Sequence, residues 1–359
     1  HRRVGGRHRA RQKGGAKLAA AALIVVAAAG AAYGFRAEIR KLIRKEPAVV
    51  ATPLPAPSGT PTPATTTAAP EPSPTRGRLV VHGTGDVNLD PDYIPAFRTH
   101  GYAHAWSGLG GLFERDHLTI VNLECAASKL GSAIPKDFTF RCDPEALPAA
   151  KRAGVEVANL GNNHSGDFGK DALLDSRRNL RRAGIEPVGA GKDERQATRP
   201  ALFDLEGWRV AVLGFGGIVP EPGWIAGPNH PGMADGDDIA KMTDAVRRAK
   251  RQADVVFVTI HWGVELDTEP RPDDIERAHA MIEAGADAIF GHHAHRLQPM
   301  AVYRDRPIFW GLGNFVWPAT SEAGATTAVA RVVVTPEGRI RGKLLPARIE
   351  SHGHPVLVR

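Results

Sequence analysis

The segment GHHAH, residues 291–295, places three histidines within five positions, directly after the apolar run ADAIF. Neutral imidazole is a common metal ligand, and its pKa near neutrality also suits it to proton transfer. In an extended segment, His293 and His295 would point to the same side while Ala294 points away. The pattern therefore predicts that one or both of these histidines reach a single metal centre.

Other residues with metal-ligating or acid–base side chains also lie directly after apolar runs. They are Asp86, Asn88, Asn122, Glu124, Asn162, Asn163, His164, His261 and Glu265. Carboxylates, carboxamides and neutral imidazoles together form mixed nitrogen and oxygen sites that suit Zn, Mn or Fe. The residue types therefore predict a divalent-metal site for one or two ions. Because the chain has no cluster of cysteines, a structural zinc site is not expected.

Short apolar runs that alternate with amphipathic stretches must position these residues. The runs RLVVHGTGDV, HLTIVNLE, VEVANLGNNH, RVAVLGFGG, DVVFVTIHWG and DAIFGHHAH each predict a strand that enters a polar loop. Helices are expected in GKDALLDSRRNLRRAG, DIAKMTDAVRRAKRQA and IERAHAMIEAGA. The alternation indicates an α/β domain with a mainly parallel sheet, followed by an antiparallel end that turns at residues 336–338. Ligands bind beyond the carboxyl ends of such strands, so the polar residues should meet at one edge.

The chain before this domain divides into three segments of different composition. Residues 1–17 are cationic, residues 18–35 carry no charge, and residues 36–76 include a long stretch rich in Pro, Thr and Ala. Eighteen helical residues span about 27 Å, close to the thickness of the hydrocarbon layer of a membrane. We expect a basic cytoplasmic tail, a transmembrane signal anchor and a disordered linker, in that order. The folded domain, residues 77–359, would then lie outside the cytoplasm on a single-pass cell-membrane protein.

The alternative for residues 18–35 is a signal peptide that is cleaved, because the segment is rich in alanine and ends in small residues. The apolar run is long for the core of a signal peptide, so we favour the anchor. Both interpretations export the C-terminal part of the chain.

Charge is distributed unevenly along the chain. Residues 1–45 contain 12 Lys and Arg against one acidic residue, whereas the remainder contains 34 basic and 38 acidic residues. The net charge of +7 therefore belongs to the N-terminal tail and not to the folded part. A nucleic-acid-binding domain needs a basic face of its own, so the composition gives no support for a nucleic-acid partner.

The chain has two cysteines, Cys125 and Cys142, and both lie in the part that we expect to be exported. A pair of cysteines in an oxidising compartment is most simply a disulfide. The alternative is two free, buried thiols.

Taken in order, the motifs GDVNL, VNLE, GNNHSGDFG, HWGVE, GHHAH and GLGNF resemble those of the CapA family of capsule or poly-γ-glutamate synthesis proteins. That family belongs to the calcineurin-like metallophosphoesterase superfamily, and the resemblance covers about residues 78–320. It implies a four-layer α/β/β/α sandwich with a metal site at one sheet edge. It also implies a role in the synthesis or export of an anionic cell-surface polymer or its precursor, together with other capsule-synthesis membrane proteins.

The same resemblance assigns roles to individual residues. The metal-ligand positions of the superfamily correspond to Asp86, Glu124, Asn163, His261, His293 and His295. His164 matches the histidine that faces the leaving group, and Asp167 would orient it. The residues expected to support these ligands or to contact substrate are Asn88, Asn122, Glu265, His292 and Asn314.

Three positions depart from the superfamily pattern. Asn88 replaces the histidine of the D-x-H motif, Ser165 replaces the acidic residue after the GNH motif, and Glu124 replaces the bridging aspartate. Two functions therefore stay open. In the first, His164 is the general acid of a metal-dependent hydrolase that cleaves phosphoesters or the amide bonds of a γ-linked polymer. In the second, the site holds a polyanion without catalysis, in a polymer assembly or export machine. Retention of His164 favours the hydrolase.

Overall fold

The computed structural model describes residues 75–358, which belong to the second of two units of the chain, residues 71–359. The predicted basic tail, the predicted anchor at residues 18–35 and the predicted linker up to residue 74 lie outside the described residues. Within the described part, none of the helices combines the length and apolar character needed to cross a membrane.

The first sheet has eight strands, in the order β18-β17-β16-β1-β2-β5-β6, with β15 paired to the end of β1. Its parallel strands are β1 (Leu79–Val87), β2 (Leu118–Leu123), β5 (Val157–Asn159), β6 (Glu186–Val188) and β15 (Asn314–Val316). The antiparallel strands are β16 (Thr326–Val334), β17 (Ile340–Ser351) and β18 (His354–Leu357). The predicted turn at residues 336–338 is confirmed, because it joins β16 to β17.

The second sheet has six strands, in the order β13-β14-β12-β11-β9-β8. Its parallel centre consists of β9 (Trp208–Gly216), β11 (Val255–His261), β12 (Ala288–His292) and β14 (Arg306–Phe309). The edge strands β8 (Ala201–Leu205) and β13 (Met300–Tyr303) are antiparallel to their neighbours. The residue pattern predicted a mainly parallel sheet, and the family resemblance predicted a four-layer sandwich with two sheets. The strands are divided between two mixed sheets, as the resemblance implied. All these central strands are buried, so their sequences give no sign of the division.

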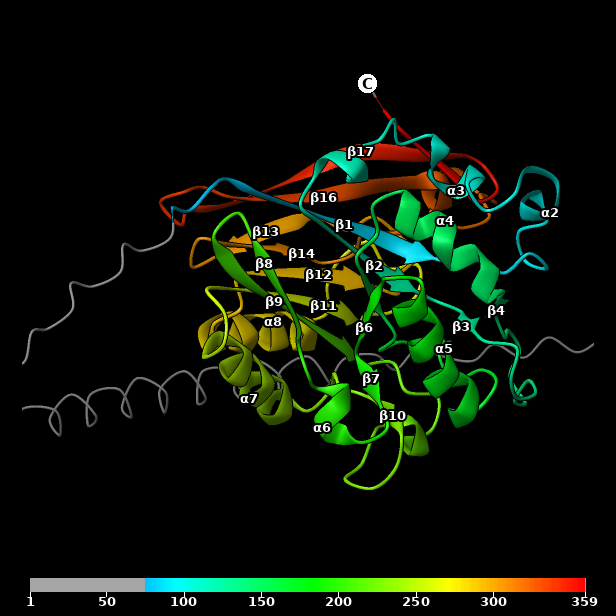
Figure 1. Ribbon diagram of the computed structural model, residues 1–359, viewed down its shortest axis with the longest axis horizontal. Helices are drawn as coiled ribbons and strands as arrows, with labels where there is room; N and C mark the ends of the chain where they lie inside the picture. Colours follow the sequence, from blue (N-terminus) through cyan, green and yellow to red (C-terminus); the bar gives the residue numbers. More distant parts are fainter. Residues whose placement is uncertain (1–74, 359) are drawn as a thin grey trace, which may run out of the picture. The chain divides into compact units, whose positions relative to one another are not determined.

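Helices cover the outer face of each sheet (Figure 1). The first sheet is covered by α4 (Leu147–Arg152) and α5 (Lys170–Arg182), and the second by α7 (Ile239–Lys250) and α8 (Pro272–Ala284). The three predicted helices are thus confirmed as α5, α7 and α8. The remaining short elements are α2 (Ala96–His100), α3 (His104–Ser107), α6 (Glu194–Ala197), α9 (Glu322–Ala325), β3 (Ala126–Ala127), β4 (Arg141–Cys142), β7 (Ala190–Gly191) and β10 (Gly232–Met233).

Three hydrophobic clusters separate four layers in the order helix, sheet, sheet, helix. Two of them lie between a sheet and its covering helices. The third lies between the sheets and joins Val81 and Ile120 of the first to Phe257 and Phe290 of the second. Gly83 of β1 allows this approach, because a Cβ there would lie 2.5 Å from the Phe290 ring. The packing of these two inner faces sets how the ends of the two sheets meet.

The predicted disulfide is wrong in this structure, because Cys125 and Cys142 are both free thiols. Both are buried in the cluster between the first sheet and its helices, close to the pairing of β3 with β4. Burial raises the pKa of the Cys125 thiol well above its ordinary value, and its contact with Cys142 raises it further.

Candidate metal centre

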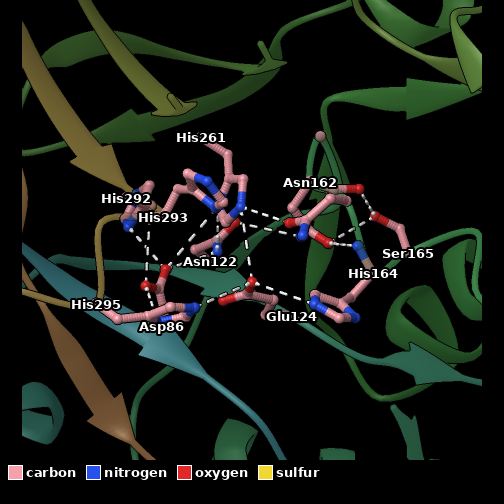
Figure 2. A network of polar contacts seen from close by, with 12 residues as sticks. Asp86, Asn122, Glu124, Asn162, His164, Ser165, His261, His292, His293 and His295 are labelled. Carbon is pink, nitrogen blue, oxygen red and sulfur yellow. Dashed lines mark hydrogen bonds and ion pairs between the residues drawn. The ribbon is translucent and has the colours of Figure 1, made fainter. Parts of the chain in front are cut away.

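The registers of the two sheets bring polar strand ends into line. Asp86 at the end of β1 is paired with Asn122 of β2 and with Asn314 of β15. In the second sheet, His261 at the end of β11 is paired with His292 at the end of β12. Figure 2 shows the residues of both sheets pointing toward one another at a shared edge. The predicted convergence of strand ends is therefore present across two sheets.

Asp86 lies at the junction between the two sheets. Its Oδ1 accepts a hydrogen bond of 2.9 Å from the carboxamide of Asn122, and its Oδ2 lies 3.1 Å from Nδ1 of His295. The backbone N–H of His293 donates to the same Oδ2 over 3.3 Å. Burial alone would raise the pKa of Asp86, but the hydrogen bond from His295 and the nearby imidazoles lower it overall. Asp86 is therefore held in its anionic form.

Glu124, just beyond the end of β2, occupies the middle of the cluster. Its Oε1 lies 3.6 Å from Nε2 of His261, 3.9 Å from Nε2 of His295 and 3.9 Å from Nε2 of His164 (Figure 2). The side chain is fully buried, and neither oxygen has a hydrogen-bond partner among residues 75–358. Burial, and next the charge of Asp86, raise the pKa of Glu124 well above its ordinary value. Its surroundings offer three imidazole nitrogens but no hydrogen bond.

His295 is oriented by two partners on one ring nitrogen. Its Nδ1 lies 2.8 Å from Oδ1 of Asn314 as well as 3.1 Å from Asp86. A proton on Nδ1 satisfies both oxygens, which leaves Nε2 directed toward Glu124. Burial lowers the pKa of His295, but the hydrogen bond and charge of Asp86 outweigh it and raise the pKa overall.

The segment that carries His293 and His295 is a turn and not an extended strand, so the expectation of simple alternation is wrong. Strand β12 ends at His292, and the φ angles of His293 and His295 are 87° and 51°. Residues other than glycine adopt such left-handed backbone uncommonly, and functional sites are one place where it is maintained. The turn directs both side chains into the cluster around Glu124.

His261 links the amide residues of the first sheet to the cluster. Asn122 donates a hydrogen bond of 3.1 Å to Nδ1 of His261, and Nε2 lies 2.7 Å from Oδ1 of Asn163. The ring of His293 packs against it, with 4.7 Å between the ring centroids. Burial, and next the neighbouring His293, lower the pKa of His261 well below its ordinary value. His261 therefore stays neutral, which is the form that ligates metals.

His292, the first histidine after Gly291 in the motif, has a different environment from His293 and His295. Its Nε2 is hydrogen-bonded to Oγ1 of Thr259 over 2.8 Å, and its Nδ1 lies 3.8 Å from Oδ1 of Asp86. Burial lowers the pKa of His292 to about 4. The hydrogen bond with Thr259 thus fixes the His292 ring next to Asp86, at a distance too long for a hydrogen bond.

His164 and Asp167 form a hydrogen-bonded pair beside the cluster. Nδ1 of His164 lies 2.7 Å from Oδ2 of Asp167, so a proton on Nδ1 leaves Nε2 facing Glu124. Lys136 donates a 2.9 Å hydrogen bond to the other Asp167 oxygen and also donates to the backbone carbonyl of Asn163. Burial lowers the pKa of His164 and outweighs the opposing effect of Asp167. This geometry suits a histidine that exchanges a proton through Nε2.

Two residues expected to support the site make no direct contact with the clustered side chains. Asn88 is buried, but its Oδ1 accepts from the backbone N–H of Asp90 and its amide nitrogen has no partner within the described part of the chain. Glu265 is exposed and has no hydrogen bond or ion pair with any residue in the described range. Its charge contributes to raising the pKa of His295, so it lies near the cluster without touching it.

Among residues 75–358, two overlapping groups of side chains could hold a metal ion. The first is Asp86, Glu124 and His295, and the second is Glu124, His261 and His293, each with ligand atoms within 4.8 Å of one another. The donors fit a divalent ion, since buried carboxylate oxygens and imidazole nitrogens are its usual ligands. Both oxygens of Glu124 and Nδ1 of His293 are buried and lack a partner among the described residues. Such groups are costly to bury unless something binds them, and a cation would do so.

Sequence reasoning missed several residues that shape the site. Lys136 comes from the loop between β3 and β4, and no motif marks it. Thr259 lies inside β11, where its side chain could be taken for ordinary strand packing. Trp317 packs its ring against His295, with 4.7 Å between the centroids. A sequence signal exists only for Trp317, which follows the GLGNF motif closely.

Comparison with known proteins gives one family. A family model described as bacterial capsule synthesis protein PGA_cap matches residues 80–319. The capsule biosynthesis protein CapA of Bacillus anthracis is 36% identical over 195 residues, which cover 52% of this chain and 47% of that protein. The PGA biosynthesis protein CapA of Bacillus subtilis (strain 168) is 31% identical over 217 residues, 60% of this chain and 57% of that protein. The chain thus spans about half the length of the curated relatives it matches.

Among solved structures, the NAD nucleotidase of Haemophilus influenzae is similar with a TM-score of 0.48 and 14% sequence identity. The likeness covers 76% of this chain and 56% of that one. At a TM-score below 0.5, it carries no argument about function.

Proposed function

The chain belongs to the family of bacterial capsule synthesis proteins, as its motifs predicted, and we propose that it is a metal-dependent hydrolase acting in the synthesis or export of a capsule or poly-γ-glutamate-type polymer. Its substrate would be the anionic polymer or a precursor of it. The bond cleaved would be a phosphoester or the amide of a γ-linked chain.

One observation carries this proposal. Glu124 is a fully buried carboxylate with no hydrogen bond within the described residues, and imidazoles of His261, His295 and His164 surround it. Leaving a buried carboxyl group unpaired costs several kcal/mol by order of magnitude, so a site with only a structural role would have replaced or satisfied it. A cation-binding role accounts for the arrangement.

A divalent ion held by Asp86, Glu124, Asn163, His261, His293 and His295 would supply Lewis-acid chemistry, which activates water and stabilises developing negative charge. The residues beside the ligands have separate tasks. With Nδ1–H held by Asp167, Nε2 of His164 would first take up a proton from solvent and then give it to the leaving atom as water adds to the other side of the bond. Asp167 holds Nδ1 and so fixes both the ring orientation and the tautomer that this transfer needs.

The test combines metal analysis with two hydrolysis assays. The purified protein, loaded with Mn or Zn, should cleave either a phosphodiester or a γ-glutamyl oligomer, and His164→Ala should lose this activity while keeping its metal. A protein that binds metal but cleaves neither substrate would contradict the hydrolase.

A second candidate is a polymer-holding role without catalysis, and the observation that favours it is Asn88. This residue stands where the superfamily has a histidine, and its carboxamide oxygen bonds to its own loop instead of facing the cluster. The first metal group therefore has one fewer imidazole than the superfamily pattern. Metal-dependent binding of the polymer without turnover, unchanged in His164→Ala, would favour this role over the hydrolase.

We also propose that residues 18–35 anchor the chain in the cell membrane and that the α/β domain lies outside the cytoplasm, near other capsule-synthesis membrane proteins. The cationic segment before these residues and the Pro-rich segment after them support this orientation. A periplasmic or extracellular reporter enzyme fused after residue 76 should be active. Activity of a cytoplasmic reporter at the same position would contradict the proposal.

A further inference from the structure

We infer that a cationic groove between α6 and α7, separate from the metal centre, binds a segment of an anionic polyamide chain. The groove has a volume of about 950 Å³ and lies between residues 192–202 and one side of α7. Figure 1 shows α6 next to α7, one of the two helices that cover the second sheet. None of the lining residues belongs to the metal groups or to the pair of His164 and Asp167. The nature of the ligand rests on the proposed function.

Positive charge predominates in the groove. Its cationic lining residues are Lys192, Arg195, Arg199, Lys241 and Arg248, against three acidic residues, Asp193, Glu194 and Asp244. All three carboxylates have partners within the protein. Glu194 pairs with Lys241 over 3.2 Å, Asp244 pairs with Arg248, and Asp193 accepts from the backbone N–H of Gln196 at the start of α6.

Three cations remain without a counter-charge. No carboxylate lies within 4 Å of Lys192, Arg195 or Arg199 in the part of the chain that the structure describes, and all three side chains are exposed. They stand within one eight-residue stretch that forms a wall of the groove. A ligand with several negative charges in a row would meet them together, which a single small anion would not.

The groove also offers neutral hydrogen-bonding groups along its length. Gln196 lines one wall, and Gln252 lies at the end of the opposite wall. Each uses only one of its two amide atoms in a hydrogen bond with the protein backbone, whereas the Thr198 hydroxyl is already bonded to Glu194 and Arg248. That wall is a stripe on α7 and the turn after it, which runs from Lys241 through Arg248 to Gln252 and spans about 16 Å at the rise of an α-helix. This length holds several residues of an extended polyamide, whose backbone amides need such partners.

The composition of the lining favours a polyamide carboxylate over a nucleic acid. None of the described residues that line the groove is aromatic, so a base has no ring to stack on there, and stacking supplies much of the affinity for single strands. A polymer that alternates amide and carboxylate groups matches the mixture of cations and carboxamides. The groove would thus hold the chain of the polymer while another part of the same chain is at the metal centre.

The test uses a fluorescent poly-γ-glutamate oligomer as the probe and measures its binding by anisotropy with the full-length protein at low salt. Arg195→Glu combined with Arg199→Glu should weaken binding about tenfold, since two exposed ion pairs become two repulsions. The matched control is Arg339→Glu with Arg341→Glu, two exposed arginines near the β16–β17 turn, which should leave the affinity unchanged. Raising the ionic strength should weaken wild-type binding more than that of the double variant.

Equal affinities of the groove variant and the control variant would overturn the inference, as would stronger binding of a single-stranded oligonucleotide than of the glutamate oligomer. The measurement is repeated in a Glu124→Gln background without divalent metal. Binding that persists there and still depends on Arg195 and Arg199 supports the groove even if the hydrolase proposal fails. Loss of all binding in that background would place the polymer at the metal centre alone and overturn the groove.

Discussion

The two sheets contribute different chemistry to the same edge. The first sheet and its loops supply oxygen donors, with Asp86 at the end of β1, Glu124 after β2 and Asn163 after β5. The second sheet supplies nitrogen donors, with His261 from β11 and the histidine turn after β12. Neither sheet alone carries a complete mixed site. The centre therefore depends on how the two sheets pack, which the hydrophobic cluster between them determines.

Burial shifts the pKa values of the oxygen and nitrogen donors in opposite directions. Burial raises the pKa of Glu124 and lowers the pKa of His261, His292 and His293, so each group is driven toward its neutral form. Without a cation, both oxygens of Glu124 and Nδ1 of His293 stay buried with no hydrogen-bond partner among the described residues. Such unpaired groups lower the free energy of unfolding, which is common at sites that must bind a ligand.

Removing the shared oxygen donor should have the largest effect. Glu124→Gln takes away the carboxylate common to both metal groups, so affinity for Mn or Zn should fall more than about 100-fold, and activity with it. The metal-free variant should have a stability close to that of wild type, because one neutral, buried polar group replaces another of the same shape. Metal titration followed by calorimetry and thermal melting checks both. Unaltered metal affinity would refute the shared role.

The pair beside the cluster should affect turnover and not metal binding. His164→Ala should lower kcat by about 10²- to 10⁴-fold, the usual contribution of a positioned proton donor. Metal content should stay at the wild-type level, since His164 belongs to neither metal group. Asp167→Asn keeps the shape of the side chain but is a weaker hydrogen-bond acceptor for Nδ1–H of His164. It should therefore lower kcat by less than His164→Ala does. Steady-state kinetics with parallel metal analysis separates these outcomes, and a fall in metal content of His164→Ala would be evidence against a purely proton-transferring role.

Weakening the contact between the sheets should impair the site from a distance. Phe290→Ala removes a fully buried ring between the sheets and should cost about 3–5 kcal/mol of unfolding free energy. The matched control is Leu173→Ala, which removes a buried side chain of α5 from the outer cluster of the first sheet. Both should lower stability, but only Phe290→Ala should also weaken metal binding. Equal effects on metal affinity would mean that sheet packing does not set the geometry of the centre.

Removing Asn314, which orients the candidate ligand His295, should affect metal binding less than removing a ligand itself. Asn314→Ala removes the 2.8 Å partner of His295 Nδ1 and should weaken metal binding or activity about 10-fold. Asn314→Asp keeps an acceptor at the same position and serves as the control. If both variants behave as wild type, Asp86 alone is sufficient to orient the ring of His295.

The smallest expected effect is a pH dependence of the metal-free protein. The pKa of His292 is lowered from its ordinary 6.5 to about 4, so the unfolded chain binds its proton more readily than the folded one. The contribution of this histidine to stability is therefore complete above pH 6.5 and is lost as the pH falls toward 4. Glu124 acts in the opposite direction, because its raised pKa favours the fold at low pH. Urea unfolding at several pH values should show a shallower loss below pH 6.5 in His292→Asn than in wild type. An identical slope would contradict the assignment.

The sequence predicted the clustering of polar strand ends better than it predicted the turn that completes the cluster. Polar residues directly after apolar runs marked Asp86, Glu124 and His261, because strand ends are visible as a change from apolar to polar. The left-handed backbone at His293 and His295 was not predictable, since few residues other than glycine adopt it and no glycine or turn motif marks residues 293–295. Lys136 was equally hidden, because it reaches Asp167 from a loop and such contacts depend on tertiary packing.

Local residue patterns did not predict which sheet each strand joins. They also did not predict that the two cysteines are free thiols. A strand buried on both faces has the same composition whichever sheet it joins, so the residue pattern alone gave one sheet where there are two. The even number of cysteines suggested a disulfide, but Cys125 and Cys142 are buried among apolar side chains as free thiols. Both outcomes depend on contacts between segments far apart in the sequence.

The most direct test of the centre is an anomalous-scattering map of crystals soaked in Mn²⁺, recorded at an energy above the manganese absorption edge. The account predicts at least one strong peak within coordination distance of a Glu124 carboxylate oxygen and of an imidazole nitrogen from His261, His293 or His295. No peak at this edge, or a peak bound by residues of only one sheet, would contradict a centre built jointly by the oxygen donors of the first sheet and the nitrogen donors of the second.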